Sequence, residues 1–159
     1  MFKATREFIN ERQPHTEITL KVVDVKKIGG GNSNNCSDDA IDFSESNDGY
    51  MTVTGWLIHP YNQLTNSTDI VQHWWNVDEQ MNYVDTTPDP LKIACEYVLD
   101  FDLYKYAFDN YDQLESIVAC SLVLSDGRYT AALADKEDIT NVRYRKISIL
   151  DNKTLYTFF

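Results

Sequence analysis

Two long runs of β-branched and aromatic residues limit the fold more than any other feature of this sequence. Tyr50 to Ile58 reads Tyr-Met-Thr-Val-Thr-Gly-Trp-Leu-Ile, and Asp69 to Val77 reads Asp-Ile-Val-Gln-His-Trp-Trp-Asn-Val. Residues of this kind fit the pleated, half-buried surface of a sheet, so both runs predict strands. A third strand is predicted over 82–86, because prolines follow it and proline cannot donate to a strand ladder. The chain therefore contains a β-sheet.

The last two of these strands are close enough in the sequence to form a hairpin. Only Asp78-Glu79-Gln80-Met81 separates them. A turn centred on Glu79 sets residues whose numbers sum to 158 opposite each other. This register predicts that His73 lies opposite Asp85 on one face of the sheet.

Around these strands the sequence predicts one further strand and a helix. Residues 17–28 place Ile18, Leu20 and Val22 at a period of two, which indicates a single half-buried strand. The glycine and asparagine run over 29–35 is typical of a loop. Acids then follow Cys36, and apolar residues recur at positions 36, 40 and 43, so a short helix is predicted to begin at Cys36.

The C-terminal part permits more than one interpretation. Residues 97–106 have strand character, whereas 111–124 read as a helical or buried segment. The run Ser-Asp-Gly-Arg over 125–128 is a turn signal that also permits a hairpin there. Residues 143–159 read as a terminal hairpin. With 159 residues, the chain is expected to form a single domain, 1–159.

Composition excludes several classes of function. There are 25 acidic and 14 basic residues, and the net charge of -11 disfavours direct binding to nucleic acids or to acidic membranes. Apolar runs are far shorter than a bilayer span and no signal segment opens the chain, so we expect a cytoplasmic protein. The cysteines lack CxxC spacing, and His15 and His59 lack a second ligand at metal spacing. We therefore expect no metal and no cofactor.

Cys36 is the residue best placed for chemistry. A cysteine at a helix N-terminus lies where the helix dipole favours the thiolate, and amides of the preceding loop, which ends at Asn35, could line an oxyanion hole. Asp38 and Asp39 oppose a further negative charge, so the thiolate needs an imidazolium partner. His73 is the candidate, with Asp85 as the residue that orients it. Cys95 and Cys120 lie among apolar residues and are not candidates.

Several motifs taken together resemble the papain-like, transglutaminase-like superfamily of cysteine proteins. They are Gly-Gly-Gly-x4-Cys-x3-Ala from Gly29, Val-Thr-Gly-Trp-Leu at 53–57, His-Trp-Trp-Asn-Val at 73–77 and Tyr-Val-Asp-Thr-Thr-Pro at 83–88. The resemblance covers roughly residues 29–90 and leaves 91–159 as a C-terminal elaboration. It implies an α+β fold in which a short helix bearing the nucleophile packs on an antiparallel sheet, with extra C-terminal strands.

The same resemblance assigns roles to individual residues. It makes Cys36 the nucleophile, His73 the base and Asp85 the orienting residue. Independently of the resemblance, Trp56, Trp74 and Trp75 are candidates to line a groove for the acyl acceptor, with Asn35 as a further substrate-binding candidate; the alternative is that the tryptophans belong to the core, as aromatic strand residues more often do. The function implied is a thiol hydrolase or acyltransferase that acts on amide bonds of a protein or peptide, as a peptidase, deamidase or transglutaminase-like enzyme. The alternative is a catalytically inactive acidic protein that binds or inhibits a basic protein partner, in the manner of a DNA mimic.

Overall fold

The computed structural model describes residues 1–15, 19–31, 36–101, 117–126, 128–135 and 143–145. The elements found in these residues are α1 (Lys3–Arg12), a 3-10 turn (Gln13–His15), β1 (Lys21–Val23), β2 (Val25–Lys27), α2 (Cys36–Ser46), β3 (Tyr50–Ile58), β4 (Ser67–Asp78), β5 (Tyr83–Asp85), β6 (Glu96–Leu99), β7 (Ile117–Ser125), β8 (Arg128–Asp135) and β9 (Arg143–Arg145). The fold class is therefore α+β, as the sequence predicts. The single-domain organisation stays a prediction, because much of 91–159 lies outside the described residues.

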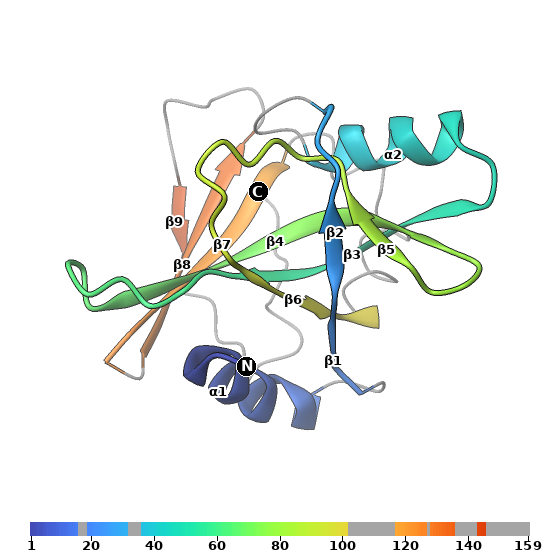
Figure 1. Cartoon of the computed structure of the whole chain (residues 1–159). Coiled ribbons are helices and arrows are strands. Elements are labelled where there is room, and N and C mark those ends of the chain that lie inside the picture. The colour runs from blue at the N-terminus through green and yellow to red at the C-terminus, as the bar shows by residue number, and fades with distance from the viewer. Residues whose placement is uncertain (16–18, 32–35, 102–116, 127, 136–142, 146–159) are drawn as a thin grey trace.

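All the described strands belong to one mixed sheet (Figure 1). Seven of them follow the order β1-β6-β3-β4-β7-β8-β9 with antiparallel neighbours. The 12-residue strand β4 pairs with β3 along one edge and divides its other edge between β7 near its start and β5 near its end. β5 also pairs with β2, and that pair is parallel. The prediction of an antiparallel sheet thus holds except at β2 and β5.

The two helices contact different parts of the sheet and lie at opposite ends of the view in Figure 1. Phe8 of α1 meets Trp56 of β3 edge to face, with ring centroids 5.4 Å apart. Helix α2 contacts β3 and β4. Eight buried residues of the strands form one hydrophobic core cluster, and they are Val23, Val53, Leu57, Trp75, Val77, Tyr83, Tyr97 and Leu99. In the described part of the chain, neither helix combines the length and the apolar character that a bilayer crossing requires.

The structure confirms several predicted elements and corrects one. The predicted strand Tyr50–Ile58 has the bounds of β3, and α2 begins at Cys36 as expected. The single strand predicted over 17–28 is wrong, because the chain changes partner at Asp24. β1 runs antiparallel to β6, whereas β2 runs parallel to β5. Ile18 lies outside the described residues.

In the C-terminal part, the hairpin alternative is confirmed. β7 and β8 pair with Ser125 opposite Arg128, which leaves a two-residue turn whose first residue, Asp126, has a φ of 51°. A positive φ at that position is typical of tight hairpin turns. The helical interpretation fails from Ile117 onward, where the chain is strand. The parts of the predicted segments that fall within 102–116 and 146–159 lie outside the described residues. Strand β9 begins at Arg143, where the first strand of the predicted terminal hairpin begins.

Candidate functional site

His73 and Asp85 meet on one face of the sheet, although not in the predicted register. The structure pairs Asn76 with Val84 and Val77 with Tyr83, so opposite residues have numbers that sum to 160 rather than 158. The predicted direct pairing is therefore wrong by two residues, and His73 lies diagonal to Asp85. Because a shift of two residues keeps every side chain on its own face, the pair still meets. His73 Nε2 lies 2.9 Å from Asp85 Oδ2.

The Asp85 carboxylate accepts hydrogen bonds from three donors. Besides His73, the Tyr97 hydroxyl donates to Oδ2 at 2.6 Å, and the Thr87 backbone amide donates to Oδ1 at 2.8 Å. Burial of Asp85 raises its pKa, but the hydrogen bond and positive charge of His73, together with the other two donors, outweigh burial and lower the pKa to about 2. Asp85 is therefore a carboxylate at neutral pH, and its oxygens have fixed positions.

The parallel pairing of β2 with β5 brings the glycine loop to the same place. Lys27 pairs with Asp85, and the Ile28 amide donates to the Asp85 carbonyl at 2.9 Å. The Gly31 amide then donates to the Thr86 carbonyl at 2.9 Å. The loop that leads from β2 to Cys36 thus starts beside the end of β5, the strand that carries Asp85.

Side chains of β3 and β4 hold α2, the helix that begins at Cys36. Asn76, fully buried, donates from Nδ2 to the Ala40 carbonyl at 2.7 Å, and Thr52 donates from Oγ1 to the same carbonyl at 3.0 Å. Because Ala40 is one turn beyond Cys36, these bonds fix the start of the helix against the strand that carries His73. The Cys36 thiol is half-buried and free of any disulfide.

The His73 imidazole is enclosed between Cys36, Asp85 and two aromatic rings. Its side chain is buried, the Trp75 ring stacks beside it at a centroid distance of 6.2 Å, and the Tyr97 ring lies at 6.0 Å. Desolvation by burial lowers the pKa of His73, but side-chain hydrogen bonds with Asp85 and Cys36, followed by their charges, outweigh it and raise the pKa to about 9. Since Nε2 faces Asp85, Nδ1 is the nitrogen left for Cys36.

These shifts predict how stability depends on pH. His73 titrates at about 9 in the folded protein and at 6.5 ordinarily, so its contribution is full below pH 6.5 and is lost as pH rises through 9. At about 1.4 kcal/mol per pKa unit, the loss is roughly 3 kcal/mol. Asp85, shifted from 3.8 to about 2, contributes above pH 3.8 and loses that contribution as pH falls through 2. In the Cys36→Ala background, which removes the opposing titration of the paired thiol, urea denaturation at pH 6.5, 8 and 9.5 should show the part of this decline that Asp85 causes, and adding His73→Gln should abolish it; an equal decline in that double variant would contradict it.

The predicted substrate-binding residues are not all brought to this site. Trp75 lies beside His73 and is fully buried. Trp56 follows Gly55, the residue opposite His73, so its side chain points to the other face, where it packs on Phe8 and donates to Asp100. Trp74 alternates with His73 in the same way and is half-buried. Asn35 lies outside the described residues.

Tyr97 was not a candidate from the sequence, although it contacts the site directly. Its strand, β6, pairs with β3 and β1, which are distant in the chain. The only available signal was a tyrosine within a short apolar strand, since a buried hydroxyl needs a hydrogen-bond partner. Nothing in the sequence indicates that the partner is Asp85.

A second cysteine–histidine contact joins Cys95 and His59, with 3.7 Å between Cys95 Sγ and His59 Nδ1. Burial lowers the pKa of His59 and raises the pKa of Cys95, so each group is held in its neutral form. A neutral thiol is a poor nucleophile. The Cys95–His59 pair therefore differs from the Cys36–His73 pair, because the pKa of His59 is lowered whereas the pKa of His73 is raised.

Within the described residues, no three histidine, cysteine, aspartate or glutamate side chains are grouped as metal ligands. The groups that the candidate site does contain are a thiol, an imidazole and a carboxylate in series. Comparison of the chain with protein-family models, with curated proteins and with solved structures found no match.

Proposed function

We propose that this protein is a thiol hydrolase or acyltransferase that acts on amide bonds of a protein or peptide, with Cys36 as nucleophile, His73 as acid and base, and Asp85 as the orienting residue. The observation that carries the proposal is the series of contacts from the Cys36 thiol to the buried His73 ring and from His73 Nε2 to Asp85 Oδ2 at 2.9 Å. The papain-like, transglutaminase-like motifs over residues 29–90 support it, because they assign the same three residues to the same roles.

The raised pKa of His73 fits an ion pair in the resting site. An imidazolium beside a thiol favours the thiolate, which is the nucleophilic form of cysteine. Asp85, a carboxylate at neutral pH, stabilises the positive ring and holds Nε2, so that Nδ1 is directed to the sulfur. Burial by Trp75 and Tyr97 keeps water from weakening these interactions.

The proposed reaction has two stages. The Cys36 thiolate attacks the carbonyl carbon of an amide, and His73 gives its proton to the departing nitrogen, which leaves a thioester on Cys36 and a neutral imidazole. Water or an amine then attacks the thioester while His73 takes its proton, and the thiolate leaves as the imidazolium reforms. Water gives hydrolysis or deamidation, and an amine gives acyl transfer.

Acylation by p-nitrophenyl acetate tests this proposal without knowledge of the substrate. We expect a burst of nitrophenol and an acetyl group attached to Cys36, which intact-mass and peptide mass spectrometry would locate. Cys95→Ala should leave the burst unchanged, and Cys36→Ser should abolish it. An acetyl group on Cys95 rather than Cys36, or an equal burst from Cys36→Ser, would overturn the proposal.

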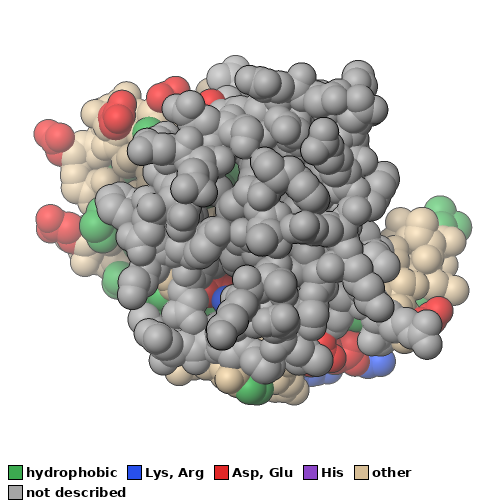
Figure 2. Space-filling view, turned by 180° about the vertical axis from the view of Figure 1, so that it is seen from behind, with side chains coloured by type: hydrophobic (Ala, Val, Ile, Leu, Met, Phe, Trp, Pro, Cys, Tyr) green, Lys and Arg blue, Asp and Glu red, His purple; other side chains and the backbone are tan. Residues whose placement is uncertain are grey.

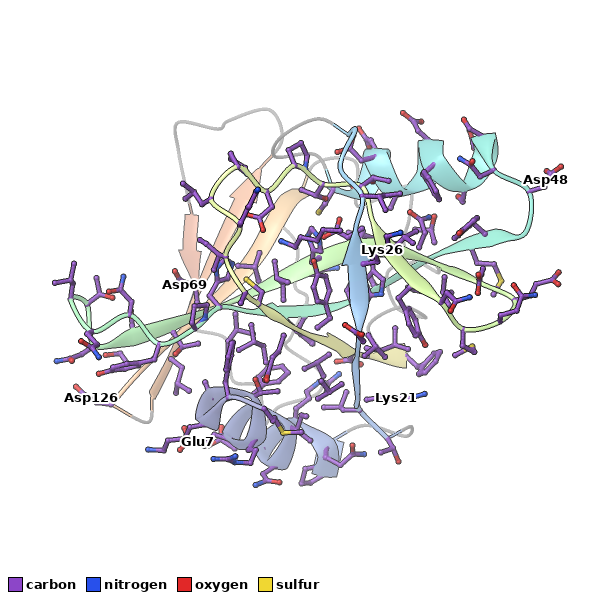
Figure 3. The ribbon with its side chains drawn as sticks, in the orientation of Figure 1. Glu7, Lys21, Lys26, Asp48, Asp69 and Asp126 are labelled. Atoms are coloured by element: carbon purple, nitrogen blue, oxygen red, sulfur yellow. The ribbon has the colours of Figure 1, made fainter. Side chains whose placement is uncertain are left out.

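The acidic binding protein has less support. Asp and Glu side chains lie along the edge of the molecule where α2 lies, but others lie elsewhere on the described surface (Figure 2). Asp48 lies at the far end of the fold from Glu7, Asp69 and Asp126 (Figure 3), and Glu7 and Asp126 line one pocket. Mimicry of a nucleic acid needs charges gathered on one face, so this distribution favours the enzyme. If Cys36→Ala leaves the biological effect of the protein intact, the binding alternative is the better one.

A further inference from the structure

Tyr97 contacts Asp85 directly, yet the reaction steps above give its hydroxyl no role. Its hydroxyl donates to Asp85 Oδ2 at 2.6 Å, the same oxygen that lies 2.9 Å from His73 Nε2. Its side chain is only 4% exposed, and its ring packs edge to face on Trp75, with centroids 5.4 Å apart. A short hydrogen bond to a carboxylate in such surroundings is strong and directional.

We propose that Tyr97 is a positioning residue that acts through Asp85, fixing the carboxylate oxygen that holds His73 Nε2 and so directing Nδ1 of His73 toward Cys36. The proposal rests on the function proposed above. It adds a fourth member, from a strand outside the motif region 29–90, to the Cys36, His73 and Asp85 series.

The arrangement of the carboxylate supports this role. Asp85 Oδ1 accepts a hydrogen bond from the Thr87 amide at 2.8 Å, but this one hydrogen bond leaves the carboxylate plane free to tilt about that contact. The Tyr97 hydroxyl removes that freedom, because β6 is fixed on both sides by β1 and β3. A carboxylate that cannot rotate presents one fixed acceptor to His73, and this fixes which ring nitrogen carries the proton.

The same hydrogen bond tunes the charge at the site. Desolvation and the nearby Asp85 carboxylate raise the pKa of Tyr97, so the phenol stays protonated and donates throughout the working range. Its donation draws negative charge from Oδ2, the oxygen shared with His73. Removing the hydroxyl should therefore leave a stronger acceptor for the imidazolium and a less firmly held ring.

The test is an NMR titration of the His73 ring nitrogens in the wild type and in Tyr97→Phe, with unfolding measured in parallel. We expect the pH midpoint of the His73 titration in Tyr97→Phe to lie about 0.5 to 1 pH unit above that of the wild type, a shift that corresponds to the net free energy of one hydrogen bond. Above that midpoint, the wild type should hold the proton on Nε2, and the variant should show both tautomers. A midpoint that is unchanged or lowered would overturn the proposal, because a tyrosine that only fills the core would not raise it.

Tyr83→Phe is the matched control. Tyr83 belongs to the same buried cluster, and among the described residues its hydroxyl has no hydrogen-bond partner. We expect Tyr83→Phe to leave the His73 titration unchanged, and a shift equal to that of Tyr97→Phe would overturn a specific role for Tyr97. Replacing Tyr97 alone by 3-fluorotyrosine, whose more acidic hydroxyl donates more strongly, should move the midpoint down, and a rise would contradict the proposal.

These readouts separate the two proposals. If the His73 titration responds to Tyr97→Phe as expected while Cys36 accepts no acyl group, the positioning role stands and the enzymatic function fails. If Cys36 is acylated while the His73 titration midpoint is the same in Tyr97→Phe and the wild type, the function stands and the positioning role fails.

Discussion

His73→Ala is expected to lower the rate constant for alkylation of Cys36 by iodoacetamide at pH 6.5 by about 10- to 100-fold. His73 contacts Cys36, and in the proposed ion pair its positive charge favours the thiolate. Without it, a thiol of ordinary acidity is only about 1% ionised at this pH, and the greater nucleophilicity of such a thiolate recovers part of the loss. Stopped alkylation reactions with peptide mass spectrometry give the rate for Cys36 itself.

His59→Ala is the control for that experiment. Among the described residues, His59 is a second histidine that contacts a cysteine, but its partner is Cys95. We expect the Cys36 rate constant to be unchanged in His59→Ala. An equal loss in both variants, or less than a threefold loss in His73→Ala, would contradict the ion pair.

Asp100→Ala is expected to lower the free energy of unfolding by about 3–5 kcal/mol, the cost of breaking a buried ion pair by removing one of its charges. Arg12 Nε lies 3.2 Å from Asp100 Oδ2, and the two side chains are 2% and 0% exposed. Trp56 Nε1 donates to the same oxygen at 3.0 Å. This network joins α1 to the sheet on the side away from the candidate site, and urea denaturation at neutral pH measures its loss.

Two further variants sharpen that result. Replacing both partners, with Arg12→Met and Asp100→Leu, removes both charges and should recover most of the loss. Lys27→Met breaks an ion pair of 2.8 Å to Asp89 that is partly open to solvent, and it should cost about 1 kcal/mol or less. If Asp100→Ala costs no more than Lys27→Met, the Arg12–Asp100 pair does not hold the helix.

Much of the candidate site could be predicted because its residues lie in locally recognisable elements. β3 and β4 are rich in β-branched and aromatic residues, and Cys36 follows a glycine loop and precedes acids. From these local patterns His73 and Asp85 were correctly predicted to share one face of the sheet, although the predicted register was wrong by two residues. A shift by one residue would have separated them, so the prediction depended on the period of two in a strand.

The rest of the site depends on contacts between distant parts of the chain. β2 lies beside β5 only because the chain changes partner at Asp24, and no local pattern indicates a parallel pair there. Tyr97 reaches Asp85 from β6 for the same reason. Helix α1 was not predicted. Its buried face includes the polar residues Thr5 and Arg12, so its sequence lacks the regular spacing of apolar residues that indicates an amphipathic helix.

The central claim is that Cys36 and His73 form a thiolate–imidazolium pair, and the ultraviolet absorbance of the thiolate measures it most directly. The difference in absorbance between the wild type and Cys36→Ala at pH 6.5 should equal one thiolate per molecule, and it should vanish in His73→Ala. The account is contradicted if the difference is absent at pH 6.5 and emerges only above about pH 8, as for an isolated cysteine.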